Sequence, residues 1–549
     1  GQKASCVFYI AKRYFRGHSG GAPSLRTTEN DIKAMTEDNK PKPLAGDEAL
    51  DLWRQGREAW NRWIKLNPNR EISFIDVDFS NQRDSEGNIS FEGYNFGNGN
   101  VDFSITTFGD GDVNFANAVF GDGDVDFSHS TFGKGYLIFS GVTFSNGDVN
   151  FVAAEFDDGY VDFSYASFGD GDVNFSEVRF GAGQVNFSHA NFGNGNVDFS
   201  ETDFGEGGVQ FDYTTFGRGE VNFFQATFGL GEFYLDHATF DDGDVDFSNV
   251  TFGRGYVDFS WTVFGNGEVN FSDADFIGSD VNFSGTKFVG LLFKPLEVDS
   301  VHIIAESLYI KSRAVFAFPA SSQTIKALEL SGASFDGAIF LSGDLGIIPD
   351  LRATRYAHQI DLSDLDVKLP RTWPRLGWPL KLSRIADNPK DGAKLRRLKE
   401  ISENNKDHQA ALRFSADENR ARRWIQTTWL GSVLDMTFSA YSNYGQSILR
   451  PSFALFLLAV GSIGVYKKLA VTTGVEWWTG PGWGQSLLLS ISNSLPFLPQ
   501  SRDFRADALK ALYPCGPSLT VDALMIGQGV LSFVFLFLIG LGLRNRFRL

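Results

Sequence analysis

The sequence predicts a parallel β-helix solenoid, followed by a helical linker and an α-helical transmembrane domain. Three observations lead to this fold class. The unit V-[DN]-F-S-x-x-x-F-G-x-G-x recurs about eighteen times, without a slip, between residues 77 and 288. Phenylalanine accounts for 54 of the 549 residues and falls at fixed positions of the unit. Two apolar stretches near the end, 448–469 and 521–543, have the length of a membrane crossing.

Each twelve-residue unit holds two blocks in which a small or branched apolar residue lies two positions before a phenylalanine. Residues i and i+2 of an extended segment share a face, so these side chains point one way and Asp or Asn the other. A twelve-residue coil is too narrow for two phenylalanines, which favours about 24 residues per coil. Stacking the regular coils at about 4.8 Å gives a rod roughly 40 Å long. Gly and Asn at the block ends are expected to supply corners with φ > 0.

Residues 185–196 illustrate the sequence of the repeat: Val-Asn-Phe-Ser-His, then Ala-Asn-Phe-Gly-Asn, then Gly-Asn. This text resembles the pentapeptide-repeat family, whose unit is A-[DN]-[LF]-x-x. It departs from that family by inserting Gly-x after every second block. The resemblance implies a right-handed quadrilateral β-helix with a ladder of phenylalanines inside.

The glycine–aspartate text of the repeat is similar to calcium-binding β-roll loops. The position between the glycines is Asp110 in one copy but Lys134, Arg218 or Leu230 in others, which favours corner chemistry and solubility over a calcium site. The outward acidic rows also fit imitation of a nucleic-acid backbone, as in pentapeptide-repeat proteins that resemble DNA, although solvated acidic faces are commoner. A net charge of −18 argues against direct binding of nucleic acid.

Residues 1–46 are expected to form a polar N-terminal segment without an apolar core of signal-peptide length. Residues 1–5 fit the loose N-myristoylation pattern, with Cys6 as a candidate for a second lipid, and this modification would require a eukaryotic host. Residues 47–70 are predicted to cap the open first coil, with a single helix over 47–66. The text Trp60-Asn61-Arg62-Trp63 within it resembles the entry segment of many pentapeptide-repeat proteins.

The solenoid is predicted over residues 71–369, with regular repeats at 77–288 and irregular closing coils at 289–369. A helical linker is predicted at 370–444. It contains a helical hairpin in which Asp407 is the N-cap of the second helix. The end of the linker mixes apolar residues with Trp, Ser and Tyr, which favours an amphipathic helix in the membrane interface.

Residues 445–549 predict a transmembrane pore-like domain. Its two apolar spans flank residues 482–499, which are too short and too polar to cross a bilayer. Their pattern is typical of a re-entrant helix, at about 485–492, followed by a loop. Span, re-entrant helix, span is the order found in two-helix ion channels.

Three motifs of this region are Tyr444-Gly445-Gln446-Ser447, Ser494-Leu495-Pro496-Phe497 and Leu543-Arg544-Asn545-Arg546-Phe547. They resemble a group of bacterial pentapeptide-repeat proteins with a C-terminal ion-channel-like region. The resemblance implies a homotetrameric pore with a cytoplasmic β-helix, in the inner membrane. The potassium-filter text T-V-G-Y-G is absent, so potassium selectivity is not predicted.

The candidate filter residues offer short side chains and backbone carbonyls to ions: Ser492, Asn493, Ser494 and Pro496. Phe497, which follows them, is a candidate hydrophobic gate. The alternative for this loop is a membrane-surface turn. Gln528 and Ser532 lie four apart on one face of the last span and are candidates for lining the conduit. Their alternative role is hydrogen bonding to neighbouring helices. Basic residues flank the spans and favour two cytoplasmic termini, although the two lysines weaken that assignment: Arg450, Lys467, Lys468, Arg544, Arg546 and Arg548.

The sequence therefore predicts an oligomeric membrane ion channel in which the β-helix is a sensor or docking domain. The predicted partners are the lipid membrane, further copies of the chain, inorganic ions and an unidentified protein on the β-helix. The alternatives are a membrane-anchored interaction platform and a nucleic-acid mimic, both without conductance. The sequence has no Ser/His/Asp order, metal-ligand spacing or phosphate-cradling loop, so no cofactor and no enzyme are predicted.

Overall fold

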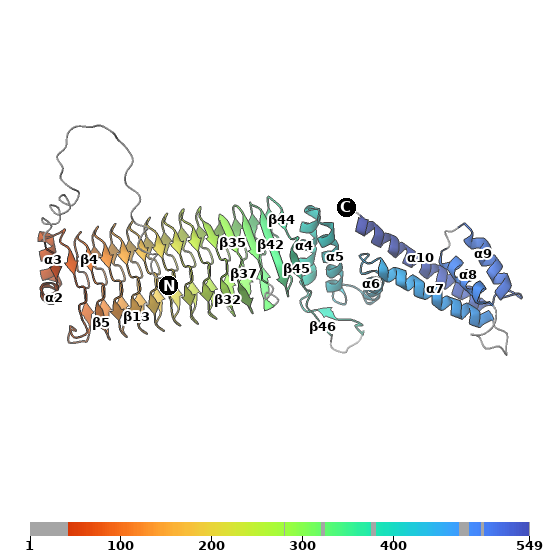
Figure 1. The fold of residues 1–549 in the computed structure, drawn as a ribbon, viewed down its shortest axis with the longest axis horizontal. Coiled ribbons are helices and arrows are strands. Elements are labelled where there is room, and N and C mark those ends of the chain that lie inside the picture. The colour runs from red at the N-terminus through yellow and green to blue at the C-terminus, as the bar shows by residue number, and fades with distance from the viewer. Residues whose placement is uncertain are drawn as a thin grey trace, which may run out of the picture.

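The protein is a long rod that continues into a helical joint and a helical bundle (Figure 1). This computed structural model describes residues 42–278, 280–319, 324–374, 380–470, 482–495 and 499–547. The rod is a parallel β-solenoid of about 13 turns over residues 44–367, which confirms the predicted fold class. The bundle contains two apolar helices near the C-terminus and extends the rod along its long axis (Figure 1).

The strands pair in parallel with strands one coil away. Val101 of β4 (Val101–Asp102) lies opposite Val125 of β8 (Val125–Asp126), and the next partner is Val149 of β12 (Val149–Asn150). This register of 24 residues confirms two units per coil. The coils build sheets of 15, 11 and 11 strands, and two four-stranded sheets joined by bridges at Asp203 form the fourth face.

Most strands of the regular coils have two residues, and several later strands are longer. Strands of the regular part that Figure 1 marks are β5 (Thr107–Gly109), β13 (Glu155–Phe156) and β32 (Asp275–Ile277). Towards the end the coils become less regular and the strands more variable in length: β35 (Gly290–Phe293), β37 (His302–Ile304), β42 (Ile339–Leu345), β44 (Ile360–Asp361) and β45 (Leu365–Val367). A short antiparallel pair, β46 (Arg371–Thr372) and β47 (Ile385–Ala386), follows the solenoid.

Stacked phenylalanine rings fill the interior of the rod. Phe103 lies over Phe127 with ring centroids 4.8 Å apart and planes 1° apart, and Phe127 lies over Phe151 at 4.8 Å. Neighbouring columns meet edge to face, as at Phe115 and Phe127, where the planes are 88° apart. Offset stacks and edge-to-face pairs are favourable arrangements of aromatic rings. Each coil is therefore stabilised mainly by the coils on either side of it.

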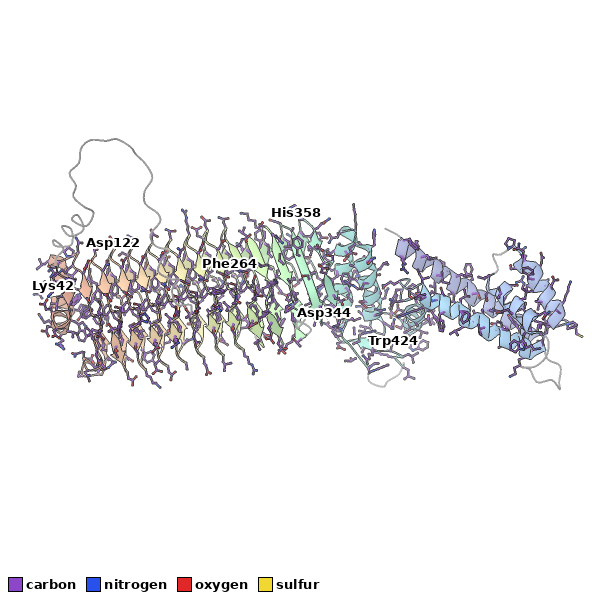
Figure 2. The ribbon with its side chains drawn as sticks, viewed as in Figure 1. Lys42, Asp122, Phe264, Asp344, His358 and Trp424 are labelled. Atoms are coloured by element: carbon purple, nitrogen blue, oxygen red, sulfur yellow. The ribbon has the colours of Figure 1, made fainter. Side chains whose placement is uncertain are left out.

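The outward Asp and Asn side chains of the repeat support the backbone of the coils. Asp102 Oδ1 accepts the Ser104 N–H at 2.8 Å, and the same contact recurs in later units. Where Asn follows Asp in a column, the amide donates to the carboxylate, as from Asn150 Nδ2 to Asp126 Oδ1 at 3.1 Å. Other acidic residues, such as Asp122, lie at the surface of the rod (Figure 2). Alternation of Asp with Asn reduces repulsion between carboxylates stacked one coil apart.

The repeat glycines are required by the close approach of neighbouring coils. A Cβ on Gly195 would lie 2.0 Å from the carbonyl oxygen of Gly171, one coil away, and most other repeat glycines meet the same obstacle. Positive φ falls instead at the fifth position of the unit, for example 57° at Tyr165 and 59° at Glu177. The expectation that Gly and Asn supply these corners is therefore wrong for most coils. A left-handed residue costs about 1–2 kcal/mol, and the hydrogen bond from Tyr165 N–H to Ser188 O, at 3.1 Å, helps to offset it.

Two short helices cover the N-terminal end of the solenoid. The single helix expected over 47–66 is wrong, because the chain breaks at Gly56, with φ of 87°, into α2 (Asp47–Arg54) and α3 (Arg57–Leu66). Trp60 of α3 is fully buried, and its Nε1 donates to Asn95 O at 2.9 Å. Its ring stacks on Phe74 with centroids 6.1 Å apart, so α3 extends the aromatic core by one layer.

A helical hairpin covers the C-terminal end. It consists of α4 (Asp391–Asn404) and α5 (His408–Arg422), and Asp407 accepts the Gln409 and Ala410 N–H groups as the expected N-cap. Apolar side chains of the hairpin belong to the same core as the solenoid. Arg397 donates to Thr354 O at 2.6 Å, and Arg413 donates to Leu365 O at 2.6 Å. These arginines satisfy carbonyls that the last coil would otherwise leave open.

In the part of the chain that the structure describes, five helices follow the hairpin: α6 (Trp429–Ser442), α7 (Leu449–Ala470), α8 (Trp483–Ser494), α9 (Ser501–Leu512) and α10 (Leu519–Phe547). Two of them, α7 and α10, are long and apolar enough to cross a membrane. The most apolar windows of α7 and α10 are only 17% and 22% buried, in contrast to core helices of soluble proteins. α7 packs along α10, and α8 and α9 lie at the end of the bundle that is far from the rod (Figure 1). α9 was not among the elements predicted from the sequence.

Candidate functional site

α8 has the length of a re-entrant helix. Its 12 residues, at a rise of about 1.5 Å each, span about 18 Å, whereas a bilayer core is about 30 Å thick. The helix extends two residues beyond the expected 485–492 at each end. It packs against α7, α9 and α10, at the end of the bundle far from the solenoid.

Three of the candidate filter residues lie in the last turn of α8, and their side chains are buried. Ser492 Oγ donates to Leu488 O of the same helix at 2.6 Å. Asn493 Nδ2 donates to Met525 O at 2.8 Å, and Ser494 Oγ lies 2.9 Å from Gln528 Nε2, which donates to it. In a single chain, the Asn493 and Ser494 side chains are therefore directed at α10. The other two candidates, Pro496 and Phe497, lie outside the described residues.

Gln528 is the centre of a buried hydrogen-bond network. Its Oε1 accepts from the Tyr466 hydroxyl at 2.6 Å and from Asn493 Nδ2 at 3.2 Å. Its Nε2 donates towards Ser490 O, at 3.1 Å, and Ser490 Oγ, at 3.0 Å, besides Ser494 Oγ. One amide thus connects α7, α8 and α10. This arrangement is the one expected if Gln528 forms hydrogen bonds to neighbouring helices.

Ser532, one turn further along α10, is fully buried, and among the described residues its Oγ has no hydrogen-bond partner. It lies on the same face of α10 as Gln528, as the four-residue spacing indicates. Whether Gln528 and Ser532 line a conduit depends on further copies of the chain, so that role stays a prediction.

Sequence reasoning missed three members of this network: Tyr466, Ser490 and Tyr513. The Tyr513 hydroxyl donates to Tyr466 O at 2.8 Å, and Ser490 Oγ donates to Ala459 O at 2.7 Å. For Ser490, the signal available in the sequence was its spacing from Ser486 and Asn493, because positions i, i+4 and i+7 share one face of a helix.

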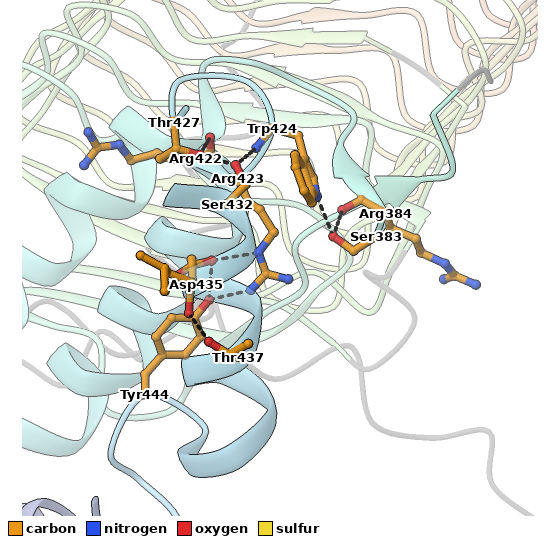
Figure 3. Close-up of polar contacts among 11 residues, drawn as sticks. Ser383, Arg384, Arg422, Arg423, Trp424, Thr427, Ser432, Asp435, Thr437 and Tyr444 are labelled. Atoms are coloured by element: carbon orange, nitrogen blue, oxygen red, sulfur yellow. Dashed lines mark hydrogen bonds and ion pairs between the residues drawn. The ribbon is translucent and has the colours of Figure 1, made fainter. Parts of the chain in front are cut away.

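A polar cluster joins the solenoid's terminal hairpin to the helical bundle (Figure 3). Arg423 Nε donates to Asp435 Oδ2 at 2.7 Å, and Arg423 Nη2 donates to the Tyr444 hydroxyl at 2.8 Å. The Tyr444 hydroxyl donates in turn to Asp435 Oδ2 at 3.0 Å. Burial raises the pKa of Tyr444, so this hydroxyl keeps its proton and remains a donor to the carboxylate.

The residues after α6 connect this cluster to α7 and α10. Asn443, Tyr444 and Gly445 all have positive φ, at 47°, 57° and 76°. Three consecutive left-handed residues are rarely stable without support. Arg420 Nη2 donates to Asn443 Oδ1 at 2.5 Å, and Asn545 Nδ2 of α10 donates to Gly445 O at 3.1 Å. The turn is therefore held by α5 on one side and by α10 on the other.

The flanking cations lie at both ends of the bundle. Arg450, Arg544 and Arg546 are exposed at the end next to the solenoid, and Arg548 lies outside the described residues. At the far end Lys468 is exposed and Lys467 is buried. α9 adds three further cations to that end, Arg502, Arg505 and Lys510, which the sequence analysis did not count.

No family model, curated protein or solved structure matches this chain. The class that the fold and the site define is a β-solenoid joined to a helical bundle with two helices that are able to span a membrane. This architecture is compatible with a membrane-anchored β-solenoid protein.

Proposed function

We propose that this protein is an oligomeric membrane channel with α7–α10 as its pore domain and the solenoid as its sensor or docking domain. The observation that carries the proposal is α8, a helix too short to span, held by buried polar contacts between two helices long enough to span. The motif resemblance adds a bacterial inner membrane, a cytoplasmic solenoid, two cytoplasmic termini and a pentapeptide-repeat origin to the proposal. No catalytic role is assigned.

A pore in this proposal requires several copies of the chain, because the polar side chains of α8 contact α10 of the same chain. The exposed surface of α8 includes the apolar side chains of Leu487, Leu488 and Ile491. This surface is available for a neighbouring copy. A homotetramer places four α8 helices and the loops that follow them around one axis, as in two-helix channels.

The joint around Arg423 supplies a route for gating. α4 and α5 share the solenoid core, and the Arg423–Asp435–Tyr444 cluster connects α5 to α6 and to the turn before α7. A partner that displaces the solenoid would thus act on α7 and α10 through this joint.

The test is the mass of the full-length protein in mild detergent, followed by conductance in planar bilayers. A tetramer with discrete single-channel currents supports the proposal. Asn493→Asp is expected to change the cation-to-anion permeability ratio, and Val460→Ile, on an exposed part of α7, is the matched control. A monomer, or a tetramer without current under every ligand and tension applied, refutes it.

A membrane-anchored interaction platform is the second candidate. The polar network around Gln528 favours this platform. Its polar groups form hydrogen bonds within one chain, whereas a pore would need polar groups that face the ions. In this case the replacement of residues 448–549 by an unrelated anchor preserves function. A nucleic-acid mimic, based on the acidic rows of the rod, would compete with DNA for a DNA-binding protein.

A further inference from the structure

An apolar groove lies between α6, α7 and α10, at the end of the bundle next to the solenoid. Its volume is about 680 Å³, within the range of small-molecule sites in proteins. Tyr441 of α6, Leu457 of α7 and Phe535 of α10 line it, together with further apolar residues of the same helices. Thr437 and the Tyr441 hydroxyl are the polar groups among the lining side chains.

A cation lies on the same face of α7 as the groove. Ala454, Leu457 and Leu458 line the groove, and Arg450 precedes Ala454 by four residues, so Arg450 lies one turn nearer the solenoid on that face. Arg450 is exposed, and among the described residues no carboxylate forms an ion pair with it. Its Nη1 is 3.4 Å from Ser439 O of α6, a weak contact that leaves its other nitrogens available.

The basic end of α10 lies at the same level. A Cβ added at Gly542 of α10 would lie 3.0 Å from the Ile448 side chain and 3.3 Å from Ser447 O, just before α7, and Arg544 and Arg546 follow within the next turn. Neither arginine forms an ion pair with a carboxylate of the part of the chain that the structure describes. Arg546 lines a separate pocket beside Asp407 and Arg413, so Arg450 is the cation that the helix register places next to the groove.

We propose that this groove binds an anionic phospholipid, with one acyl chain between α6, α7 and α10 and the phosphate at Arg450. The apolar lining fits a hydrocarbon chain, and the guanidinium group fits a phosphate, which it binds with two parallel hydrogen bonds. The charge favours an anionic headgroup over a zwitterionic one. A helix of a second copy would match the apolar lining but would leave Arg450 without an anion.

The inference requires insertion into a membrane, as the proposed function does, but it does not require conduction. The experiment is native mass spectrometry of the full-length protein, released from detergent after incubation with phosphatidylglycerol or phosphatidylcholine. The expected result is at least one phosphatidylglycerol retained per chain, several-fold more than phosphatidylcholine. Arg450→Gln is expected to lower phosphatidylglycerol retention about tenfold, and Arg450→Lys to restore part of it.

Two variants fill the groove, Ala454→Trp and Leu458→Trp, so that a folding failure of one leaves the other informative. Both are expected to release the lipid. The control is Val460→Trp, because Val460 is 48% exposed on α7 and does not line the groove. Circular dichroism and the oligomer mass identify variants that fold.

Equal retention of the two lipids by the unmodified protein, or unchanged retention by both folded tryptophan variants, overturns the proposal. If these variants reduce the oligomer mass while the lipid count stays constant, a second copy occupies the groove and the proposal is also wrong. A protein that retains the lipid but conducts no ions refutes the channel and keeps the lipid site. A conducting protein without lipid preference refutes the site alone.

Discussion

Replacement of Gln528 by Leu is expected to loosen α8 from α10. Nε2 has three acceptors within 3.1 Å but carries two hydrogens, and Oε1 accepts from Tyr466 and Asn493, so up to four hydrogen bonds exist at one time. Hydrogen bonds between membrane helices contribute about 0.6 kcal/mol each on average, which gives a loss of about 2–3 kcal/mol. Leu has nearly the volume of Gln, so little of this effect comes from a cavity.

The assay is unfolding of the full-length protein in mixed micelles, with the helical signal followed as the fraction of SDS increases. Gln528→Leu is expected to unfold at a lower SDS fraction than the unmodified protein. Ser532→Ala is the matched control, because Ser532 is equally buried on the same face and its Oγ has no partner among the described residues. That variant is expected to change the free energy of unfolding by less than about 0.5 kcal/mol.

The reasoning is refuted if Gln528→Leu unfolds at the same SDS fraction as the unmodified protein. It is also refuted if Ser532→Ala has an effect as large as that of Gln528→Leu. Either result would mean that the geometry of the network does not determine the stability of the bundle.

Three further predictions concern the rod, its cap and the orientation in the membrane. Gly195→Ala is expected to destabilise the solenoid by about 1–3 kcal/mol in thermal unfolding, whereas Gly208→Ala, whose Cβ would meet no atom closer than 3.5 Å, has a much smaller effect. Burial raises the pKa of Asp391 to about 6 from 3.8, so the folded state binds this proton more tightly, and the free energy of unfolding decreases from pH 4 to pH 7 by up to about 3 kcal/mol. Asp391→Asn is expected to remove that component of the pH dependence. Cys515, exposed between α9 and α10, is expected to react with a membrane-impermeant maleimide from the side opposite the solenoid, in a Cys6→Ser background.

Each of these expectations has a clear contrary result. Equal melting temperatures for the two alanine variants would contradict the steric role of the repeat glycines. An unchanged difference in stability between pH 4 and pH 7 in Asp391→Asn would show that other groups titrate there. Labelling of Cys515 from the solenoid side would mean that the two spans do not separate it from the rod.

The solenoid could be predicted because its signal is periodic. A twelve-residue period with two phenylalanines per unit determines a stacked aromatic core, and ring volume alone gives 24 residues per coil. The role of the glycines could not be predicted in this way, because a glycine needed for φ > 0 and a glycine needed for close contact look the same in a sequence. The contact of Gly195 with the neighbouring coil is visible in the structure alone.

The helical part was predicted less completely, because its elements depend on contacts between distant residues. Gly56 looks like a tolerated glycine within an amphipathic pattern, yet the chain breaks there so that Trp60 can lie flat on the first coil. α9 carries Phe504, Ala508 and Leu512 at i, i+4 and i+8 among alternating charges, and two of these three residues are buried in the core of the bundle, so its apolar stripe was a signal that the prediction overlooked. Gln528 and Asn493 were identified as polar residues of interest, but their mutual partners depend on how α8 enters the bundle.

The separation of the two hydrophobic cores determines where movement between the rod and the bundle can occur. One core runs from Leu44 through the solenoid to Ala421 of α5, and a second surrounds Tyr466 in the bundle. A continuous core resists relative movement of its parts, because any shift exposes apolar surface. The segment between the cores is held largely by polar contacts, with Arg423 and Asn545 at its two ends. Relative movement is therefore least costly at this joint, and a solenoid that is displaced as one body would deliver its motion to the turn before α7.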